Sequence, residues 1–118
     1  GLGDVYKRQD LTKQKCEACT IDAPLVDKKR FTELLKDLDG WEIIYEDINI
    51  LSKTYSFDNY EDSVKFATDI VKLAENEDHH PSILLEWGSV RVQWWSHKIK
   101  GLHMNDFICA AKTETLIN

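Results

Sequence analysis

Apolar residues recur at helical spacing in the segment DKKRFTELLKDLDG (27–40). Four of them lie three or four positions apart and form one face: Phe31, Leu34, Leu35 and Leu38. Asp27 is suited to cap the start of such a helix, and Gly40 to end it. The pattern therefore predicts an amphipathic helix between these two residues.

A second helical pattern covers DNYEDSVKFATDIVKLAENED (58–78), where Asp58 or Asn59 can act as the N-cap. This helix must stop before Pro81, because the residue before a proline avoids the α region. A third helix is expected from about His103 through MNDFICAAKTETL. The expected apolar stripe of the second helix consists of Tyr60, Val64, Ala67, Val71 and Ala74, flanked by Phe66 and Ile70.

Two other segments are rich in aromatic and β-branched residues, as strands are. The segment Trp41–Phe57 predicts two strands around a turn near Glu46-Asp47-Ile48. The pattern does not define the register of this pair, because its alternation is imperfect.

The best hairpin pattern is ILLEWGSVRVQWWSH, in which Ile83–Trp87 and Val90–Ser96 flank a turn at Gly88-Ser89. Side chains alternate between the two faces of a strand. One face of the second arm is expected to carry Val90, Val92 and Trp94, and the other Arg91, Gln93 and Trp95.

The predicted element order is α-β-β-α-β-β-α. Two hairpins separated by a helix favour an α+β domain, with a four-stranded antiparallel sheet and helices packed on one face. A chain of 118 residues is long enough for one such domain. Residues 1–9 have no periodicity and no cap, and we interpret them as a disordered tail or a sequence-assembly scar. The domain is then expected at 10–118, with an irregular stretch from Asp10 to Pro24.

Composition and charge narrow the class of function. Hydrophobic residues make up 42% of the chain and charged residues 31%, a soluble globular profile. The formal net charge of −6 argues against nucleic acid or an anionic membrane as the ligand, since binding phosphate needs a basic face. Apolar runs are too short to span a bilayer, and the N-terminus shows no signal peptide. A cytoplasmic protein is expected.

The three cysteines do not form a recognisable site. Cys16 and Cys19, in CEAC, have the spacing of half a zinc site, but no second pair exists. A thioredoxin-like motif would follow a strand, and none is predicted before CEAC. We interpret these residues and Cys109 as reduced, non-catalytic thiols.

The stretch ENEDHHP carries the candidate chemistry. His79 and His80 precede the third strand, and His97 ends the fourth. A hairpin about Gly88-Ser89 would return His97 to the level of Pro81. The three histidines are therefore expected to converge at one edge of the sheet.

Each histidine alone is more simply explained as a cap or as a cation at a helix end. Their convergence beside Glu75 and Asp78 favours a site, because carboxylates fix imidazole tautomers. Zinc is disfavoured, since adjacent histidines in an extended segment point to opposite sides. Acid–base chemistry fits better, because the unperturbed pKa of histidine, about 6.5, allows proton exchange near neutral pH.

Other catalytic motifs are missing from the sequence, which has neither a nucleophile elbow nor a Gly-rich phosphate loop. The aromatic load is high, and most of it is expected in the core or an interface. One tryptophan could instead line a planar heteroaromatic ligand; the candidates are Trp41, Trp87, Trp94 and Trp95.

With these residues in place, the chain resembles the pterin-4a-carbinolamine dehydratase family. The resemblance rests on ENEDHHP, Trp87, WWSH ending in His97, GLHMND ending in Asp106, and Gly40-Trp41. It covers about Asp10 to Thr113, and the CEAC start resembles bacterial members.

The resemblance implies the fold inferred above and an activity: dehydration of 4a-hydroxytetrahydropterin to quinonoid dihydropterin, which recycles the cofactor of aromatic amino acid hydroxylases. It implies a pterin substrate, no metal or other cofactor, and a homodimer or homotetramer with sheets joined edge to edge. A hydroxylase is a possible partner. Animal relatives also bind a homeodomain transcription factor, a role that we do not transfer to a chain resembling bacterial members. The alternative is a non-enzymatic protein-binding regulator on the same fold, with a transcriptional or hydroxylase partner.

The resemblance also implies site residues. His79, His80 and His97 match the family's active-site histidines. Our hypothesis is that His79 and His97 share the acid–base work, while His80 positions the pterin. Asp106 can alternatively be explained as a helix-start carboxylate, three residues after a cap at His103. The expected substrate-binding positions are Asp78, Trp95, Ser96 and Lys98, with Trp41, Glu75 and Asp106 in the pocket.

Overall fold

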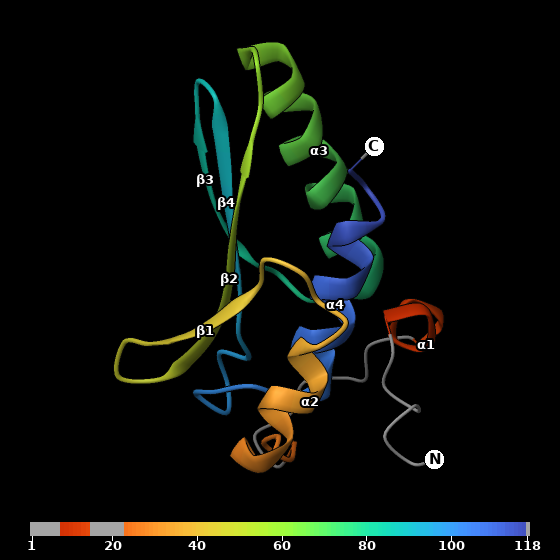
Figure 1. Cartoon of the computed structure of the whole chain (residues 1–118), viewed down its shortest axis with the longest axis vertical. Helices are drawn as coiled ribbons and strands as arrows, with labels where there is room; N and C mark the ends of the chain where they lie inside the picture. The colour runs from red at the N-terminus through yellow and green to blue at the C-terminus, as the bar shows by residue number, and fades with distance from the viewer. Residues whose placement is uncertain (1–7, 15–22, 118) are drawn as a thin grey trace.

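The computed structural model describes residues 8–14 and 23–117 of the chain. Four strands form one antiparallel sheet in the order β1-β2-β4-β3, and Figure 1 shows the helices gathered on one of its faces. The predicted α+β class is confirmed. The elements are α1 (Arg8–Lys13), η2 (Lys28–Arg30), α2 (Phe31–Leu35), β1 (Glu42–Tyr45), β2 (Asn49–Ser56), α3 (Tyr60–Glu77), β3 (Ser82–Glu86), β4 (Ser89–Trp94) and α4 (Met104–Glu114).

Both predicted hairpins form. Strands β1 and β2 flank the expected turn, in which Asp47 takes a positive φ of 68°. The second turn differs by one residue from the prediction: Glu86 pairs with Ser89, so Trp87 and Gly88 make the turn. Gly88 lies against the end of β2, where its carbonyl accepts a hydrogen bond from the Phe57 N–H at 2.8 Å.

The first predicted helix is shorter than expected. Asp27 does cap its start, but the chain begins as a 3-10 turn and α2 ends at Leu35, well before Gly40. Bonds of the i to i−3 type follow, such as that from the Leu38 N–H to the Leu35 carbonyl at 3.1 Å. This tightening still buries Leu38, and Gly40, with φ of +81°, turns the chain into β1.

The prediction of an irregular stretch after Asp10 was wrong at its start, because α1 occupies Arg8–Lys13. This helix packs against α4 on the side away from the sheet, where Leu11 is fully buried (Figure 1). A single buried apolar residue, Leu11, creates no hydrophobic periodicity, so the sequence pattern did not predict this helix. Cys16 and Cys19 lie outside the described residues.

The orientation predicted for α3 was wrong in part. Asn59 caps the helix as expected, but Tyr60, Val64 and Val71 are 39–51% exposed. The buried face consists of Ser63, Phe66, Ala67, Ile70, Ala74 and Glu77. Its two polar members have partners, since Ser63 Oγ donates to the Trp87 carbonyl and Glu77 pairs with Lys112. Counting apolar positions alone could not detect such a face.

The core lies between the sheet and the helices. Val90, Val92 and Trp94 of β4 share one face, as predicted, and that face is the core one, since all three are fully buried. Helix α4 begins after His103, as expected, and runs through this core with Phe107 fully buried. None of the helices in the described part of the chain combines the length and apolar character needed to cross a membrane.

Candidate active site

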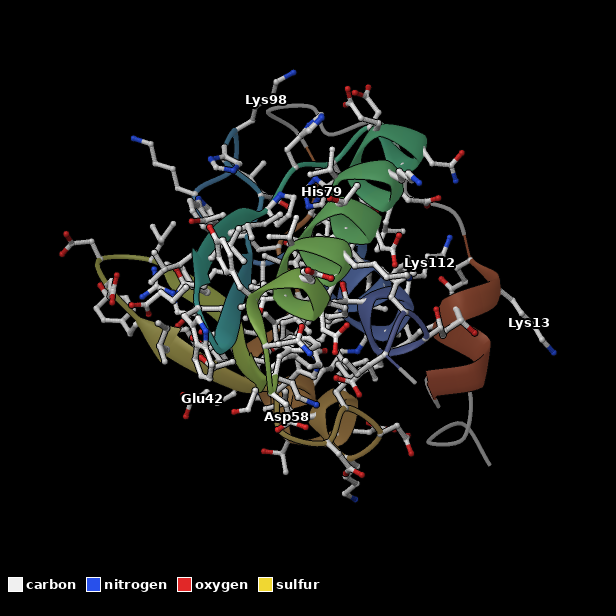
Figure 2. The ribbon with its side chains drawn as sticks, turned by 90° about the horizontal axis from the view of Figure 1, so that it is seen from above. Lys13, Glu42, Asp58, His79, Lys98 and Lys112 are labelled. Carbon is white, nitrogen blue, oxygen red and sulfur yellow. The ribbon has the colours of Figure 1, made fainter. Side chains whose placement is uncertain are left out.

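The end of α3 aims the first histidine inward. Asp78 follows the helix in the left-handed conformation, with φ of 50°, and the His79 N–H closes back on the Ala74 carbonyl at 3.1 Å. Aspartate tolerates this conformation better than most residues do. The chain therefore reverses at Asp78, and the His79 side chain is only 5% exposed (Figure 2).

A buried carboxylate holds this imidazole. His79 Nε2 lies 2.6 Å from Asp106 Oδ1, and Asp106 is fully buried. The other carboxylate oxygen, Oδ2, accepts hydrogen bonds from Ser96 Oγ at 2.8 Å and from the His103 N–H at 2.9 Å. A carboxylate can only accept, so His79 donates through Nε2 and its Nδ1 is the nitrogen able to take up a proton.

The indole of Trp94 supports the ring of His79 from the sheet. The two rings stack with centroids 5.6 Å apart and planes 12° from parallel. Pairing of β3 with β4 ends at Ser82 opposite Gln93, and continuing this register places Ser96 opposite His79. The strand order therefore explains why Ser96 and His79 reach the same carboxylate.

His97 was expected to end the fourth strand and to lie level with Pro81. It lies instead in the loop that follows β4. The strand stops at Trp94, and Ser96 forms an isolated bridge with Gly101 that closes the loop 97–100. Because the hairpin turn comes one residue earlier than predicted, the residues after β4 lie opposite other residues of the facing segment than expected. His97 is exposed, and its ring lies 4.4 Å from that of Trp95.

Two further predicted residues, Asp78 and Lys98, are exposed: Asp78 directly precedes His79, and Lys98 lies in the loop 97–100. Figure 2 shows the Lys98 side chain extending outward, while His79 lies beneath the end of α3.

His80 faces the opposite way from His79, as expected for neighbours in an extended segment. Its side chain is 57% exposed, and Nε2 lies 2.7 Å from Glu75 Oε2. Both residues line a pocket of about 250 Å³ whose other walls are mostly apolar: Val71, Ala74, Pro81 and Ile83. The structure thus brings Glu75 to His80, whereas the sequence had indicated only a carboxylate near the histidine pair.

Trp41 lies elsewhere. Its Nε1–H donates to Glu114 Oε1 at 2.8 Å, near the C-terminal end of α4. Glu114 follows Asp106 by eight residues, about 12 Å along a helix. The structure therefore does not bring Trp41 to the histidines.

Sequence reasoning missed the cluster around Glu114. The same Oε1 also accepts hydrogen bonds from Lys53 Nζ at 2.6 Å and from the Tyr55 hydroxyl. Burial would raise the pKa of Glu114, but bonds from Lys53, Tyr55 and Trp41 outweigh it and hold this pKa below its usual value. Burial, and then the hydrogen bond to Glu114, raises the pKa of Tyr55. The cluster ties β2 to α4.

Among residues 8–14 and 23–117, no group of three or more His, Cys, Asp or Glu side chains is arranged to hold a metal ion. Cys109 is fully buried in α4. The arrangement around His79 is suited instead to proton transfer, since a buried carboxylate orients one imidazole while two others stand exposed nearby.

The fold and this site define a class: a two-layer α+β protein in which a buried histidine at the end of one helix bonds to a carboxylate in the first turn of another. The model of the family "Pterin 4 alpha carbinolamine dehydratase" matches residues 24–116. The chain belongs to this family.

Relatives with high identity support the assignment. A Vibrio vulnificus protein, strain YJ016, is 53% identical over 108 residues, which covers 91% of this chain and 98% of the relative. A Vibrio cholerae protein, serotype O1 strain O395, is 51% identical over 107 residues, with 90% and 98% covered. Both carry the name "Putative pterin-4-alpha-carbinolamine dehydratase".

Two solved structures share the fold. A Brucella melitensis protein described as a transcriptional coactivator/pterin dehydratase superposes with a TM-score of 0.75 at 22% identity, covering 80% of this chain and all of that one. A pterin dehydratase-like protein identified as a RuBisCO assembly factor in the alpha-carboxysome gives a TM-score of 0.56 at 19% identity, covering 65% and 88%. At these identities the likeness extends to the fold alone.

Proposed function

We propose that this protein dehydrates 4a-hydroxytetrahydropterin to quinonoid dihydropterin, in recycling of the tetrahydropterin cofactor of aromatic amino acid hydroxylases. The observation that carries the proposal is the buried His79–Asp106 pair, with Nε2 and Oδ1 2.6 Å apart, beside the exposed His80 and His97. Family membership and the names of the relatives support the same reaction.

The reaction needs two proton transfers. The bond between the ring carbon and the 4a-hydroxyl breaks, and that hydroxyl takes up a proton and leaves as water. The neighbouring ring nitrogen loses its proton, so the net change is loss of one water molecule. One group must therefore accept a proton and another must donate one.

His79 is suited to accept. Asp106 orients its ring and favours the imidazolium that forms when Nδ1 takes a proton, the role that an aspartate has in a Ser-His-Asp triad. Ser96 and the His103 N–H in turn hold the carboxylate. His97, exposed and resting against Trp95, is then the donor to the departing hydroxyl.

His80 and Glu75 position the substrate in this proposal. They line the pocket of about 250 Å³, and the apolar walls suit one side of a planar ring. Asp78 and Lys98 are the expected polar contacts. Trp41 is left out of the proposed site, because it bonds to Glu114 at the other end of α4.

The test is turnover of freshly generated 4a-hydroxytetrahydropterin by the parent, His79→Ala and His97→Ala. We expect each variant to lose on the order of 10²-fold or more in kcat, the usual contribution of a general acid or base. Trp87→Ala is the matched control, because Trp87 is exposed in the turn after β3, and it should keep the parent rate. Full activity in both histidine variants, or a folded parent that is inactive, would refute the proposal.

A protein-binding role is the second candidate, and the exposed face of α3 favours it. Tyr60, Val64 and Val71 are all exposed, although their spacing puts them on one stripe of the helix. In this second proposal the same face also joins the subunits of a homodimer or homotetramer. Sedimentation of the parent and Val64→Glu measures self-association, because Val64 is exposed and does not line the pocket assigned to the pterin. A folded parent without pterin turnover, whose self-association Val64→Glu abolishes, would favour this role over the enzymatic one.

A further inference from the structure

A histidine caps the helix that carries Asp106. His103 has extended backbone angles, and its Nδ1 accepts a hydrogen bond from the Asn105 N–H at 3.0 Å. In return, its own N–H donates to Asp106 Oδ2 at 2.9 Å. This is a capping box in which an imidazole stands where serine or threonine is usual.

The geometry defines the charge state of this imidazole. A backbone N–H can only donate, so Nδ1 of His103 must carry a lone pair and the ring must be neutral. In a protonated ring, Nδ1–H would face the Asn105 N–H, so that two donors would oppose each other. His103 is only 4% exposed, so water has little access to either donor. It would also place a cation at the positive end of the α4 dipole.

The cap and the catalytic pair share one carboxylate. Asp106 binds His79 through Oδ1, while Oδ2 accepts bonds from Ser96 and from the capping residue. The first turn of α4 therefore sets the position of the carboxylate that orients His79. The cap bonds directly to this turn, so a change in the cap displaces the turn and the Asp106 carboxylate with it.

We propose that His103 is a positioning residue for the His79–Asp106 pair and that it acts only in its neutral form, so that its protonation loosens the pair. The effect on turnover rests on the proposed function, but the effect on the site does not. Histidine is the side chain whose charge ordinarily changes between pH 5 and 8, whereas serine at the same position would not titrate.

The carboxylate bonded to the cap, Asp106, is already engaged by other donors. Both oxygens of Asp106 already accept hydrogen bonds. Arg30 approaches from η2, with Nη2 3.9 Å from Met104 Sδ, and brings positive charge. Titratable and charged groups also lie on the segments next to the cap. The loop before it carries His97, Lys98 and Lys100, and Asp27 follows Val26, whose N–H bonds to the Leu102 carbonyl; His79 meets the cap through Asp106.

The test compares the parent with His103→Ser, which keeps a capping oxygen, and His103→Ala, which does not. Melting temperature is measured from pH 8 to pH 5. At pH 8 the parent and His103→Ser should agree, and His103→Ala should melt roughly 3–6 °C lower, as expected for a lost cap. At pH 5 the parent should fall to the level of His103→Ala, while His103→Ser keeps its advantage. A constant gap between parent and His103→Ser at all pH values would overturn the proposal.

Nuclear magnetic resonance of the histidine rings tests positioning directly. In the parent, the His79 signal should shift in step with the titration of His103, and His103→Ser should abolish that step. Identical His79 signals in the parent and His103→Ala at every pH would overturn the positioning role. Asn59→Ala is the matched control: it removes the cap of α3, about 27 Å from the far end of that helix, and should lower stability equally at all pH values.

Turnover adds an independent reading. If the parent is active, His103→Ser should keep activity to lower pH than the parent does. If the parent is inactive at every pH, the proposed function fails, and the melting and resonance measurements still decide whether His103 is a titrating cap.

Discussion

Replacing Asp106 by asparagine should reverse the tautomer of His79. Asp106 Oδ2 accepts two hydrogen bonds, from Ser96 Oγ and the His103 N–H. An asparagine would therefore keep its oxygen on that side and turn its NH2 group toward His79 Nε2. That nitrogen would then have to accept, and the ring proton would move to Nδ1.

The consequence is a folded protein without its base. With the proton on Nδ1, the nitrogen proposed to accept a proton from the pterin is blocked. The equivalent change in a Ser-His-Asp triad lowers kcat about 10⁴-fold, and a loss on the order of 10²–10⁴ is expected here. Stability should fall only by roughly 1–3 kcal/mol, because one charge-assisted hydrogen bond becomes a neutral one and the cap remains.

Asp106→Ala is the contrasting variant. It leaves the donors of Ser96, His79 and the His103 N–H without their acceptor in a buried site. Removing one partner of such a buried group costs about 3–5 kcal/mol. The alanine variant should therefore lose stability and activity together, whereas the asparagine variant should lose mainly activity.

The assays are pterin turnover, unfolding in urea and nitrogen resonance of the His79 ring. The resonance separates the Nε2–H tautomer from the Nδ1–H tautomer in the parent and in Asp106→Asn. The reasoning fails if Asp106→Asn keeps the parent kcat, or if His79 retains its Nε2 proton in that variant.

Three further outcomes are expected. Ser96→Ala removes one donor to Asp106, so it should lower the free energy of unfolding, measured in urea, by about 1 kcal/mol and should lower kcat several-fold. An unchanged kcat would show that Ser96 does not contribute to catalysis. The pKa of Glu114 is held below its usual value, so its contribution to stability is present at neutral pH and is lost as the pH falls through that lowered pKa. Glu114→Gln should therefore be destabilised by roughly 1–3 kcal/mol at pH 7, with the gap to the parent closing as the pH falls through the lowered pKa and pterin turnover retained; a gap independent of pH would contradict this. Leu11→Ala should cost about 2–4 kcal/mol if α1 is part of the domain, because Leu11 is fully buried against α4, and unfolding in urea without change would show α1 to be dispensable.

Local patterns in the sequence determined most of the elements. Period-two alternation predicted which residues of β4 share a face. Of the two caps expected for α3, Asp58 or Asn59, the structure uses Asn59, and His103 caps α4 at the position that the family resemblance implied. The order of hairpins and helices was enough to predict the sheet with helices on one face. These features depend on residues that are close to one another along the chain, so the sequence displays them directly.

The candidate site was only partly visible in the sequence. The pairing of His80 with Glu75 follows from their five-residue separation at the end of a helix. The bond between His79 and Asp106 spans 27 residues, and it depends on how α4 lies against the end of α3. The three donors around Glu114 lie 59 to 73 residues away along the chain, so no local pattern could indicate them.

The sequence by itself determined most of the secondary structure, two of the helix starts and the residue types of the site. The tertiary structure decided which face of α3 is buried, that α1 packs on α4, and that one carboxylate joins His79, Ser96 and the cap of α4. The physical reason is that spacing reports hydrogen bonds and contacts within one element, whereas burial of a polar group becomes favourable only when a distant partner satisfies it.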